Sequence, residues 1–429
     1  MKMGIYIGRR FALAVMLTTV FCLGSVLSPS VASATVYYVA TTGNDSRSCA
    51  TAQTISTPKA TIVSGITCLR AGDTLYIRQG TYISENIDTA GINIPSGTSW
   101  SNPVTIAGYP GETVTMLQGN IKLHGYDTTS YIIFNNIIID CAATECGIYL
   151  RDPVHHIRFS NMEVMNSTTS SNGAGMIAGN ASFLEFLNSK IHDAGAGNCS
   201  TYANQGCYGF YINGHDNLID GCQIYNNGGF GLHMYSASGH GVDNNIIRNS
   251  IFYGNGFNDA RGLVGSGLLL SSGDNNVAYN NIAYSNAGDG ISVNCTNCAA
   301  YNNTVYSNQF GIGVNSVSTN AIIRNNIAYQ NGNGSVAHQI VDWGAAGIVV
   351  DHNLVAVDPY FVNASAHNFS LQAGSPGIDA GATINVVTTD IQGIARSQGA
   401  AYDIGAYEYS TGSTPLPTPS NLRLISVSP

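Results

Sequence analysis

The sequence has few charged residues and very little lysine. Only 10% of its 429 residues are charged, whereas an average soluble domain carries about 25%. Lysine occurs four times, and the formal net charge is -9. Because binding to nucleic-acid phosphates needs a basic face, this composition argues against a nucleic-acid partner.

Good helix formers give way to glycine and asparagine. The chain contains 49 glycines and 44 asparagines. Both residue types are poor helix formers, so a helical bundle is excluded as the main architecture. The hydrophobic fraction of 44% is too high for a disordered chain and is sufficient for a large core.

Residues 1–34 have the pattern of a secretory signal. Basic residues start the segment, residues 11–26 are apolar, and Ala32-Ser33-Ala34 supplies a small-residue cleavage site. The apolar stretch is shorter than the ~20 residues that span a bilayer. We expect export with cleavage before Thr35, no membrane span afterwards, and a secreted or cell-surface location.

Nine cysteines remain after this predicted cleavage. An exported chain can keep disulfides, and the simplest pairing joins near neighbours in the sequence: Cys49 with Cys68, Cys141 with Cys146, Cys199 with Cys207, and Cys295 with Cys298. The connectivity is open, and zinc is a rival reading for the last pair, although no second pair lies at zinc-finger spacing. Cys222 is left over.

From about residue 121 the sequence repeats. Three copies open at Gly267, Gly290 and Gly311, which are 23 and 21 residues apart. Each copy has an alternating apolar strand, a turn, a second such strand, an Asn pair and a Tyr followed by Asn. A fixed period near twenty indicates a solenoid, and the short strands with Gly/Asn turns indicate a β-solenoid.

The Asn pairs predict an internal ladder. Stacked coils place equivalent residues about 4.8 Å apart, so an inward Asn can bond its neighbours above and below. The aligned column is Asn161, Ser189, Cys222, Ser250, Asn281, Asn303, Asn326 and Asn353. Cys222 is therefore interpreted as a small buried member of a stack and not as a reactive thiol.

Three segments resemble the secreted right-handed parallel β-helix proteins of the pectate-lyase-like superfamily. They are the N-terminal stretches YYVATTGND (37–45) and AGDTLYIRQGTY (71–82), the repeat itself, and the C-terminal stretches SPGIDAG (375–381) and DIGAYE (403–408). The resemblance implies an all-β, single-stranded solenoid of PbH1-type repeats. It is weak for the reaction, because this fold carries lyases, hydrolases, epimerases, adhesins and binding proteins.

The predicted organisation has five parts. They are a signal peptide (1–34), an N-terminal cap with the first coils (35–120), β-helix repeats (121–357), a closing segment (358–409) and a Pro-rich linker and tail (410–429). Within the cap, Thr57-Pro58 is predicted to start a short helix over residues 59–69 that plugs the first coil.

One outward-facing stripe carries the candidate site. Positions two and four after each opening Gly should face solvent, and in the earlier coils these are Tyr149, Arg151, Tyr211, Asn213, His233 and Tyr235. Stacking predicts that Tyr211 neighbours His233 and that Asn213 lies beside Tyr235. Long connections at 167–174, 194–208 and 257–266 should wall this stripe, since insertions in a solenoid map to one face.

An open groove of Tyr, His and Asn suits a sugar chain. For β-elimination on a uronate polymer, the preferred assignment is His233 as base and Tyr211 as acid, with Arg151 or Asn213 against the carboxylate. Tyr149 and Tyr235 would be sugar platforms, Tyr235 could replace the acid, and Arg261 is a second cation candidate.

A calcium site is the open alternative for the carboxylate. Its candidate ligands are Asp193, Asp216, Asp220, Asp243 and Asp259, and their convergence cannot be derived from the sequence. No cofactor is required by the preferred assignment. Hydrolysis fits less well, because it generally needs two carboxyl groups and the stripe offers none.

The sequence thus predicts an exported, monomeric polysaccharide lyase that cleaves a uronate-containing extracellular glycan. The alternative is a non-catalytic extracellular protein that binds or displays glycan.

Overall fold

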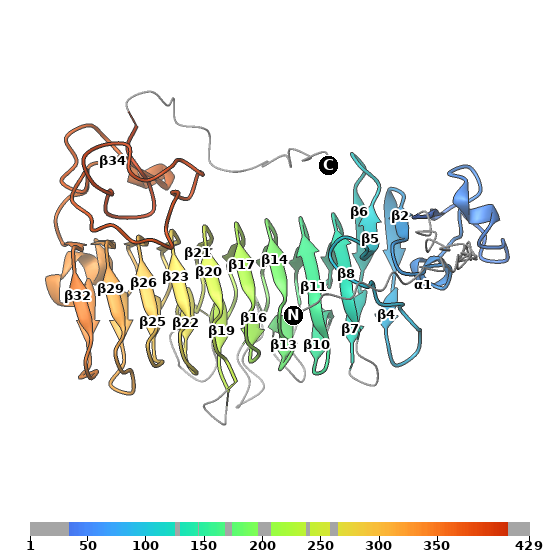
Figure 1. Ribbon diagram of the computed structural model, residues 1–429, viewed down its shortest axis with the longest axis horizontal. Helices are drawn as coiled ribbons and strands as arrows, with labels where there is room; N and C mark the ends of the chain where they lie inside the picture. The colour runs from blue at the N-terminus through green and yellow to red at the C-terminus, as the bar shows by residue number, and fades with distance from the viewer. Residues whose placement is uncertain are drawn as a thin grey trace, which may run out of the picture. The chain divides into compact units, whose positions relative to one another are not determined.

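The computed structural model describes residues 34–124, 129–144, 146–167, 174–195, 207–236, 241–257 and 265–410. The predicted signal segment up to Ser33 and the tail from residue 411 lie outside these ranges. The described chain is a right-handed parallel β-helix, as predicted, with three long parallel sheets around one core (Figure 1). None of its helices is long and apolar enough to cross a membrane.

Sheet A has 12 strands. They are β1 (Val36–Val39), β2 (Thr74–Ile77), β5 (Val104–Gly108), β8 (Ser130–Asn135), β11 (His155–Ser160), β14 (Glu185–Leu187), β17 (Leu218–Asp220), β20 (Ile246–Arg248), β23 (Val277–Tyr279), β26 (Ala299–Tyr301), β29 (Ile322–Arg324) and β32 (Val349–Asp351).

Sheet B has 11 strands. They are β3 (Gly80–Ile83), β6 (Val114–Leu117), β9 (Ile138–Asp140), β12 (Glu163–Met165), β15 (Lys190–His192), β18 (Gln223–Tyr225), β21 (Ile251–Tyr253), β24 (Ile282–Tyr284), β27 (Thr304–Tyr306), β30 (Ile327–Tyr329) and β33 (Leu354–Val355).

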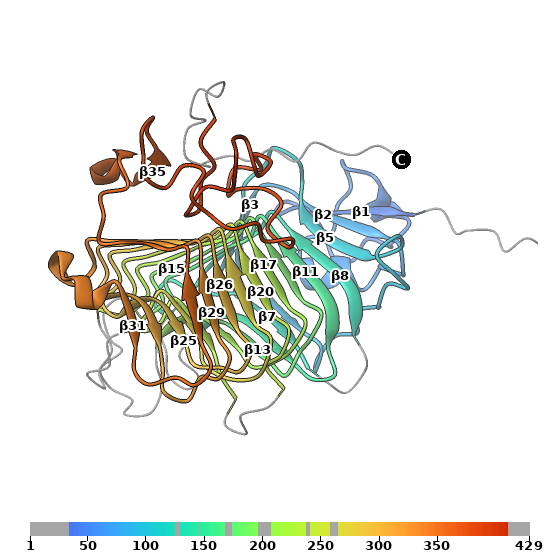
Figure 2. The same cartoon turned by 60° about the vertical axis from the view of Figure 1, so that its left-hand side comes forward.

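Sheet C has 10 strands. They are β4 (Asn86–Asp88), β7 (Asn120–Leu123), β10 (Gly147–Arg151), β13 (Ala174–Gly179), β16 (Tyr208–Ile212), β19 (Leu232–Met234), β22 (Leu268–Leu270), β25 (Asp289–Val293), β28 (Phe310–Val314) and β31 (Ile340–Asp342). Each coil passes from sheet C through A to B and then begins the next coil, so neighbours in a sheet belong to successive coils (Figure 2).

The interior is filled by stacked apolar side chains. Phe134, Phe159 and Phe186 stack in consecutive coils with ring centroids 5.2 Å apart, and all three are buried. This regular stacking follows from the period of two along each strand, which sends alternate side chains inward in every coil.

Asparagine side chains form the predicted ladder at the turn between sheets A and B. The Asn303 carboxamide oxygen accepts the Asn281 backbone N–H at 2.9 Å, and its amide group donates to Asn326 Oδ1 at 3.0 Å. In an earlier coil, Ser250 Oγ accepts the backbone N–H of Cys222 in the same way, at 3.1 Å. Cys222 itself is a buried free cysteine. The structural interpretation of Cys222 is thereby confirmed.

The first member of the predicted column was misplaced by one residue. Ser189 Oγ accepts the backbone N–H of Met162, so Met162 is the ladder residue of that coil. Asn161 is instead the corner residue before it, with φ 53°. Asn tolerates this left-handed conformation, which explains why an Asn precedes the ladder position in so many coils.

A second ladder accompanies the first. Its members are buried: Asn227, Asn255, Asn286, Asn308 and Asn331. The backbone N–H of each donates a hydrogen bond to the carboxamide oxygen of the next. Gln339 ends the series by accepting from Asn331. This ladder explains the Asn that follows Tyr in each repeat.

The N-terminal helix is shorter than predicted and begins later. α1 covers Ile62–Ile66, and its N-cap is Thr61, not Thr57. The preceding residues cannot be helical, because Lys59 pairs with Val39 of β1 and the Asp45 carboxylate accepts the backbone N–H of Thr61. Ile62 and Ile66 are fully buried against the first coil, which fits the predicted capping role.

The C-terminal segment packs along the outside of the coils. It contains the antiparallel pair β34 (Phe361–Asn363) and β35 (Asn368–Leu371), followed by irregular chain. Arg396 and Glu408 form an ion pair at 3.0 Å whose side chains are both fully buried. Asp390 and Asp403 accept backbone N–H groups and hold turns of this segment.

Three of the predicted disulfides are present within the described residues: Cys49–Cys68, Cys141–Cys146 and Cys295–Cys298. The last one excludes the zinc reading of that pair. Cys207 is also disulfide-bonded, while its predicted partner Cys199 lies outside the described residues.

Candidate functional site

The outer face of sheet C carries the predicted stripe in the predicted register. Tyr149 pairs with Ile177, Ile177 with Tyr211, and Tyr211 with His233. The stripe then continues through Leu269, Ser292 and Gly313. Residues far apart in the chain therefore share one external line, because parallel coils stack without a register shift.

His233 lies at the centre of an aromatic cluster. Its ring stacks with those of Phe230 and Tyr235, at centroid distances of 5.0 and 5.5 Å. Tyr208 approaches at 4.7 Å, and Tyr211 meets the imidazole edge-on at 5.3 Å. The half-buried imidazole is thus held in one orientation on the outer face of the sheet, with the Tyr211 ring as its direct neighbour.

Tyr211 is a protonated hydroxyl at any physiological pH. Burial, with smaller effects from Tyr208 and Tyr235, raises the pKa of its phenol to about 12. Its O–H donates to the backbone carbonyl of Tyr235 at 3.3 Å. That long bond keeps the hydroxyl on the His233 side of the stripe and is weak enough to be exchanged for a ligand oxygen.

Arg151 and Asn213 lie two residues after Tyr149 and Tyr211, in a second outward column beside the stripe. Between their two strands lies Gly179, where an added Cβ would sit 3.6 Å from Arg151 Cγ and 3.8 Å from Asn213 Oδ1. The Asn213 oxygen also accepts the Asn180 N–H at 2.7 Å. Asn213 is one coil from Tyr235, as predicted, whereas Arg151 is three coils from Tyr235, or about 14 Å at the usual rung spacing.

Tyr149 belongs to the far end of the stripe. It is two coils from Tyr211 and lies under the Lys122 ammonium, which is 5.6 Å from its ring centroid. Arg261 lies outside the described residues, as do most of the residues in the three long connections.

Two residues on this face were missed by the sequence reasoning. Asp289 is only 8% exposed, and burial raises the pKa of its carboxyl to about 6. Trp343 is 42% exposed and lies over Gly313, where an added Cβ would be 2.5 Å from the indole and 2.7 Å from Asp289 Oδ2. Asp289 was overlooked because it precedes its opening Gly, and only positions after that Gly were considered.

The candidate calcium ligands do not converge. Asp193 binds His192, Asp216 binds His215, and Asp220 binds Arg248, while Asp243 accepts the backbone N–H of Asp274. Across the described ranges no three His, Cys, Asp or Glu side chains are grouped to hold a metal ion, and Asp259 lies outside those ranges. The described donor set therefore does not fit a calcium site.

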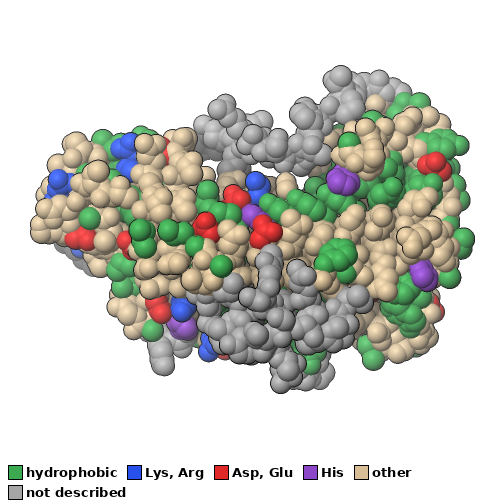
Figure 3. Space-filling view, turned by 180° about the vertical axis from the view of Figure 1, so that it is seen from behind, with side chains coloured by type: hydrophobic (Ala, Val, Ile, Leu, Met, Phe, Trp, Pro, Cys, Tyr) green, Lys and Arg blue, Asp and Glu red, His purple; other side chains and the backbone are tan. Residues whose placement is uncertain are grey.

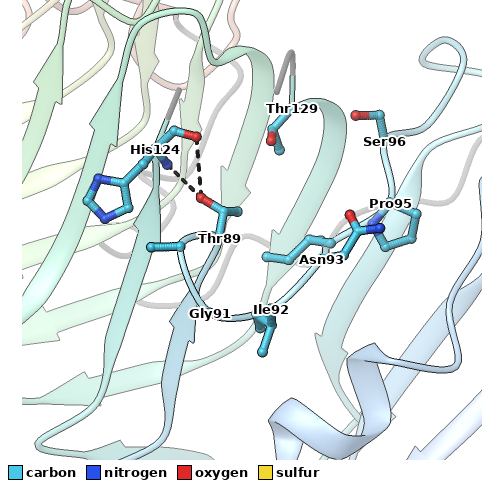
Figure 4. A pocket seen from close by; sticks show the side chains of 10 residues that line it. Thr89, Gly91, Ile92, Asn93, Pro95, Ser96, His124 and Thr129 are labelled. Carbon is cyan, nitrogen blue, oxygen red and sulfur yellow. Dashed lines mark hydrogen bonds between the residues drawn. The ribbon is translucent and has the colours of Figure 1, made fainter. Parts of the chain in front are cut away.

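A separate cavity of about 440 Å³ lies near the N-terminal end of the coil. The loop after β4 surrounds it, and His124 bonds Thr89 through its backbone at one side (Figure 4). The lining residues that the structure describes include no Asp, Glu, Lys or Arg, and His124 Nε2 lies 3.4 Å from Asp88 Oδ1. Among its described lining residues, no imidazole adjoins a phenol as His233 adjoins Tyr211 on the outer face of sheet C.

Comparison with known proteins matches the chain to one family. A family model described as "Pel9A-like, right handed beta helix region" matches residues 37–341. The crystal structure of pectate lyase Pel9A superposes with a TM-score of 0.65 at 18% identity, covering 89% of this chain and 98% of that one. The complex of XylC with xylose gives a TM-score of 0.55 at 10% identity and covers 87% and 98%. No curated protein matches the sequence.

Proposed function

We propose that this chain, which belongs to the Pel9A-like right-handed β-helix family, is an exported polysaccharide lyase that cleaves a uronate-containing glycan by β-elimination. At this level of identity the solved structures share its fold. The pectate lyase named among them indicates the substrate class that we propose.

One observation carries the proposal: an imidazole and a phenol occupy adjacent rungs on the outer face of sheet C, with ring centroids 5.3 Å apart. β-Elimination needs a base for the proton beside the uronate carboxyl group and an acid for the departing glycosidic oxygen. His233 is the proposed base, and its four aromatic neighbours restrict its orientation. Tyr211 is the proposed acid, since its raised pKa keeps it protonated.

Asn213 is the proposed contact for the uronate carboxyl group. It lies one coil from Tyr235 and beside Tyr211 on the same strand extension, whereas Arg151 reaches the site only across Gly179. Tyr235, with 39% of its surface exposed, and Trp343 are proposed platforms on which sugar rings pack. The chain is proposed to act as a secreted monomer.

The test is to incubate the mature protein with a panel of uronate polysaccharides and follow ultraviolet absorbance of the unsaturated product. We expect His233→Ala and Tyr211→Phe each to lower the rate by about 10²–10⁴-fold. His215→Ala is the matched control, because its side chain is 44% exposed in the turn between β16 and β17, where it contacts Asp216 and Phe183 away from the outer face of sheet C.

Full activity of His233→Ala would refute the assignment of the base. Binding without product on the whole panel would favour a non-catalytic glycan-binding protein. Loss of activity on chelation would move the carboxylate contact to a metal and refute the role given to Asn213.

A further inference from the structure

A second cavity lies on the sheet B flank of the coil, between sheet B and the C-terminal segment. It has a volume of about 310 Å³, and we call it the flank cavity. Acidic, basic and His side chains gather near the middle of this flank, beside a band of apolar side chains (Figure 3). The lining residues are Lys190, Gln223, Ile251, Tyr253, Ile282, Tyr284, Ala366, His367, Phe369 and Tyr407.

The floor of the flank cavity is built by register. Gln223, Ile251 and Ile282 occupy one outward column of sheet B in successive coils. The neighbouring column holds Tyr253 and Tyr284, whose rings stack with centroids 5.0 Å apart. Such a ladder turns its phenol edges, and not its faces, away from the sheet.

The wall comes from the C-terminal segment. The His367 ring stacks on Tyr284 at a centroid distance of 4.3 Å, and Phe369 lies 5.5 Å from the same ring. His367 has φ 57° and follows a 3-10 turn, η5 (Ala364–Ala366), whose N-cap Asn363 accepts the Ala366 N–H. The wall is therefore held in place by its own turn as well as by the aromatic stack.

The described lining residues are rich in hydrogen-bond donors and include no carboxylate. This is unusual for a chain with a net charge of -9 and four lysines. Lys190 is exposed, and its ammonium makes no hydrogen bond to another described residue. The three phenols stay protonated, since burial raises the pKa of Tyr253, Tyr284 and Tyr407.

The nearest carboxylates are already satisfied. Glu163 is one coil before Lys190, but it binds His192 Nε2 at 3.0 Å, and Asp193 binds Nδ1 of the same ring at 2.7 Å. The two carboxylates raise the pKa of His192 against the opposing effect of burial. His192 is therefore the hydrogen-bonding partner of both carboxylates, and Lys190, which attracts Glu163 electrostatically from the next coil, keeps its side chain exposed at the rim of the cavity.

We propose that the flank cavity is a second saccharide site that binds the carboxylate of an acidic sugar. Lys190 would contact the carboxylate, His367 and the phenols would bond sugar hydroxyls, and Ile251 and Ile282 would pack against the apolar side of the ring. A cavity of this size with an apolar floor and a few convergent polar groups is typical of a small-ligand site. The site would hold one part of an acidic polysaccharide away from sheet C, and it does not depend on cleavage at His233.

The experiment measures binding of trigalacturonate to the mature protein by calorimetry. We expect Lys190→Gln to weaken binding about tenfold, which corresponds to loss of one charge-assisted hydrogen bond. Arg70→Gln is the matched control, because it removes one exposed cation from the N-terminal cap and should change affinity less than twofold. Ala366→Trp, at an exposed position on the rim, should block the cavity without disturbing the coil.

Two ligand controls decide the chemistry. The methyl ester of trigalacturonate should bind as weakly to the native protein as the free acid binds to Lys190→Gln. Acetate should bind far more weakly than the trisaccharide. Equal binding of ester and acid, or of acetate and trisaccharide, would overturn the proposal, as would unchanged affinity in both Lys190→Gln and Ala366→Trp.

The two proposals fail separately. Cleavage that is lost in His233→Ala while Lys190-dependent binding persists would support both. Lys190-dependent binding without any cleavage would leave the flank site standing and refute the proposed lyase. Cleavage without Lys190-dependent binding would support the proposed lyase and refute the flank site.

Discussion

Replacing Asn303 by alanine should destabilise the coil strongly, although the residue touches no proposed site. Its side chain is fully buried and makes four hydrogen bonds. It accepts from the backbone and the amide of Asn281, and it donates to Ala278 O and to Asn326 Oδ1.

The magnitude follows from those bonds. Each buried hydrogen bond contributes about 1 kcal/mol net, and a buried donor left without an acceptor costs about 1–3 kcal/mol. In Asn303→Ala the backbone N–H of Asn281 loses its acceptor inside the coil. We therefore expect the free energy of unfolding to fall by about 3–5 kcal/mol. Asn303→Ser should lose less, because Ser250 Oγ serves the equivalent N–H of Cys222.

Urea unfolding followed by circular dichroism measures the effect through the transition midpoint. Asn320→Gly is the control: Asn320 is an exposed corner residue with φ 54°, and glycine accepts that conformation. Its midpoint should stay close to that of the native protein. If Asn303→Ala unfolds at the same urea concentration as Asn320→Gly, the ladder does not hold the coils together.

Three further predictions concern titratable groups. The pKa of Asp289 is raised from 3.8 to about 6, so the folded state keeps a proton that the unfolded state releases, and the free energy of unfolding should fall as pH rises through this window. In urea titrations, Asp289→Asn should therefore be about 2–3 kcal/mol more stable than the native protein above pH 6 and little more stable at pH 4. Equal gains at both pH values would refute this. The pKa of His192 is raised from 6.5, and that of Glu163 is lowered from 4.5. His192→Asn should therefore lose most stability between pH 4.5 and 6.5, and the loss should shrink as pH rises through the folded pKa of His192. A loss that did not vary with pH would contradict the ion pairs. Cys222, whose pKa burial raises to about 12, should resist iodoacetamide in the folded protein and react on unfolding, as mass spectrometry would show; rapid native labelling would contradict its burial.

Much of the fold could be predicted because a solenoid makes local and long-range patterns coincide. Once the repeat near Gly267, Gly290 and Gly311 is aligned, each residue's neighbours in adjacent coils follow from its place in the period. The contact between Tyr211 and His233 was predicted in this way. The alignment failed at Asn161, since a corner Asn and a ladder Asn are the same residue type one position apart.

Other features depend on contacts that the period does not encode. The C-terminal segment reaches back over sheets A and B, so that Asn280 donates to Thr389 O across 109 residues. The flank cavity exists only because of that return. The helix start moved from Thr57 to Thr61 for a similar reason, because Asp45 and the strand pairing of Lys59 outweigh the local signal of Thr57-Pro58.

Because each Asn rung bonds only to the rung on either side, the coil can grow or shrink by whole turns without altering its two ends. Inserting one turn between His233 and Trp343 would lengthen the proposed saccharide-binding face of sheet C by about 4.8 Å and leave the adjacent His233 and Tyr211 rings in place. Substrate length preference and chemistry can therefore diverge independently in proteins built on this scaffold.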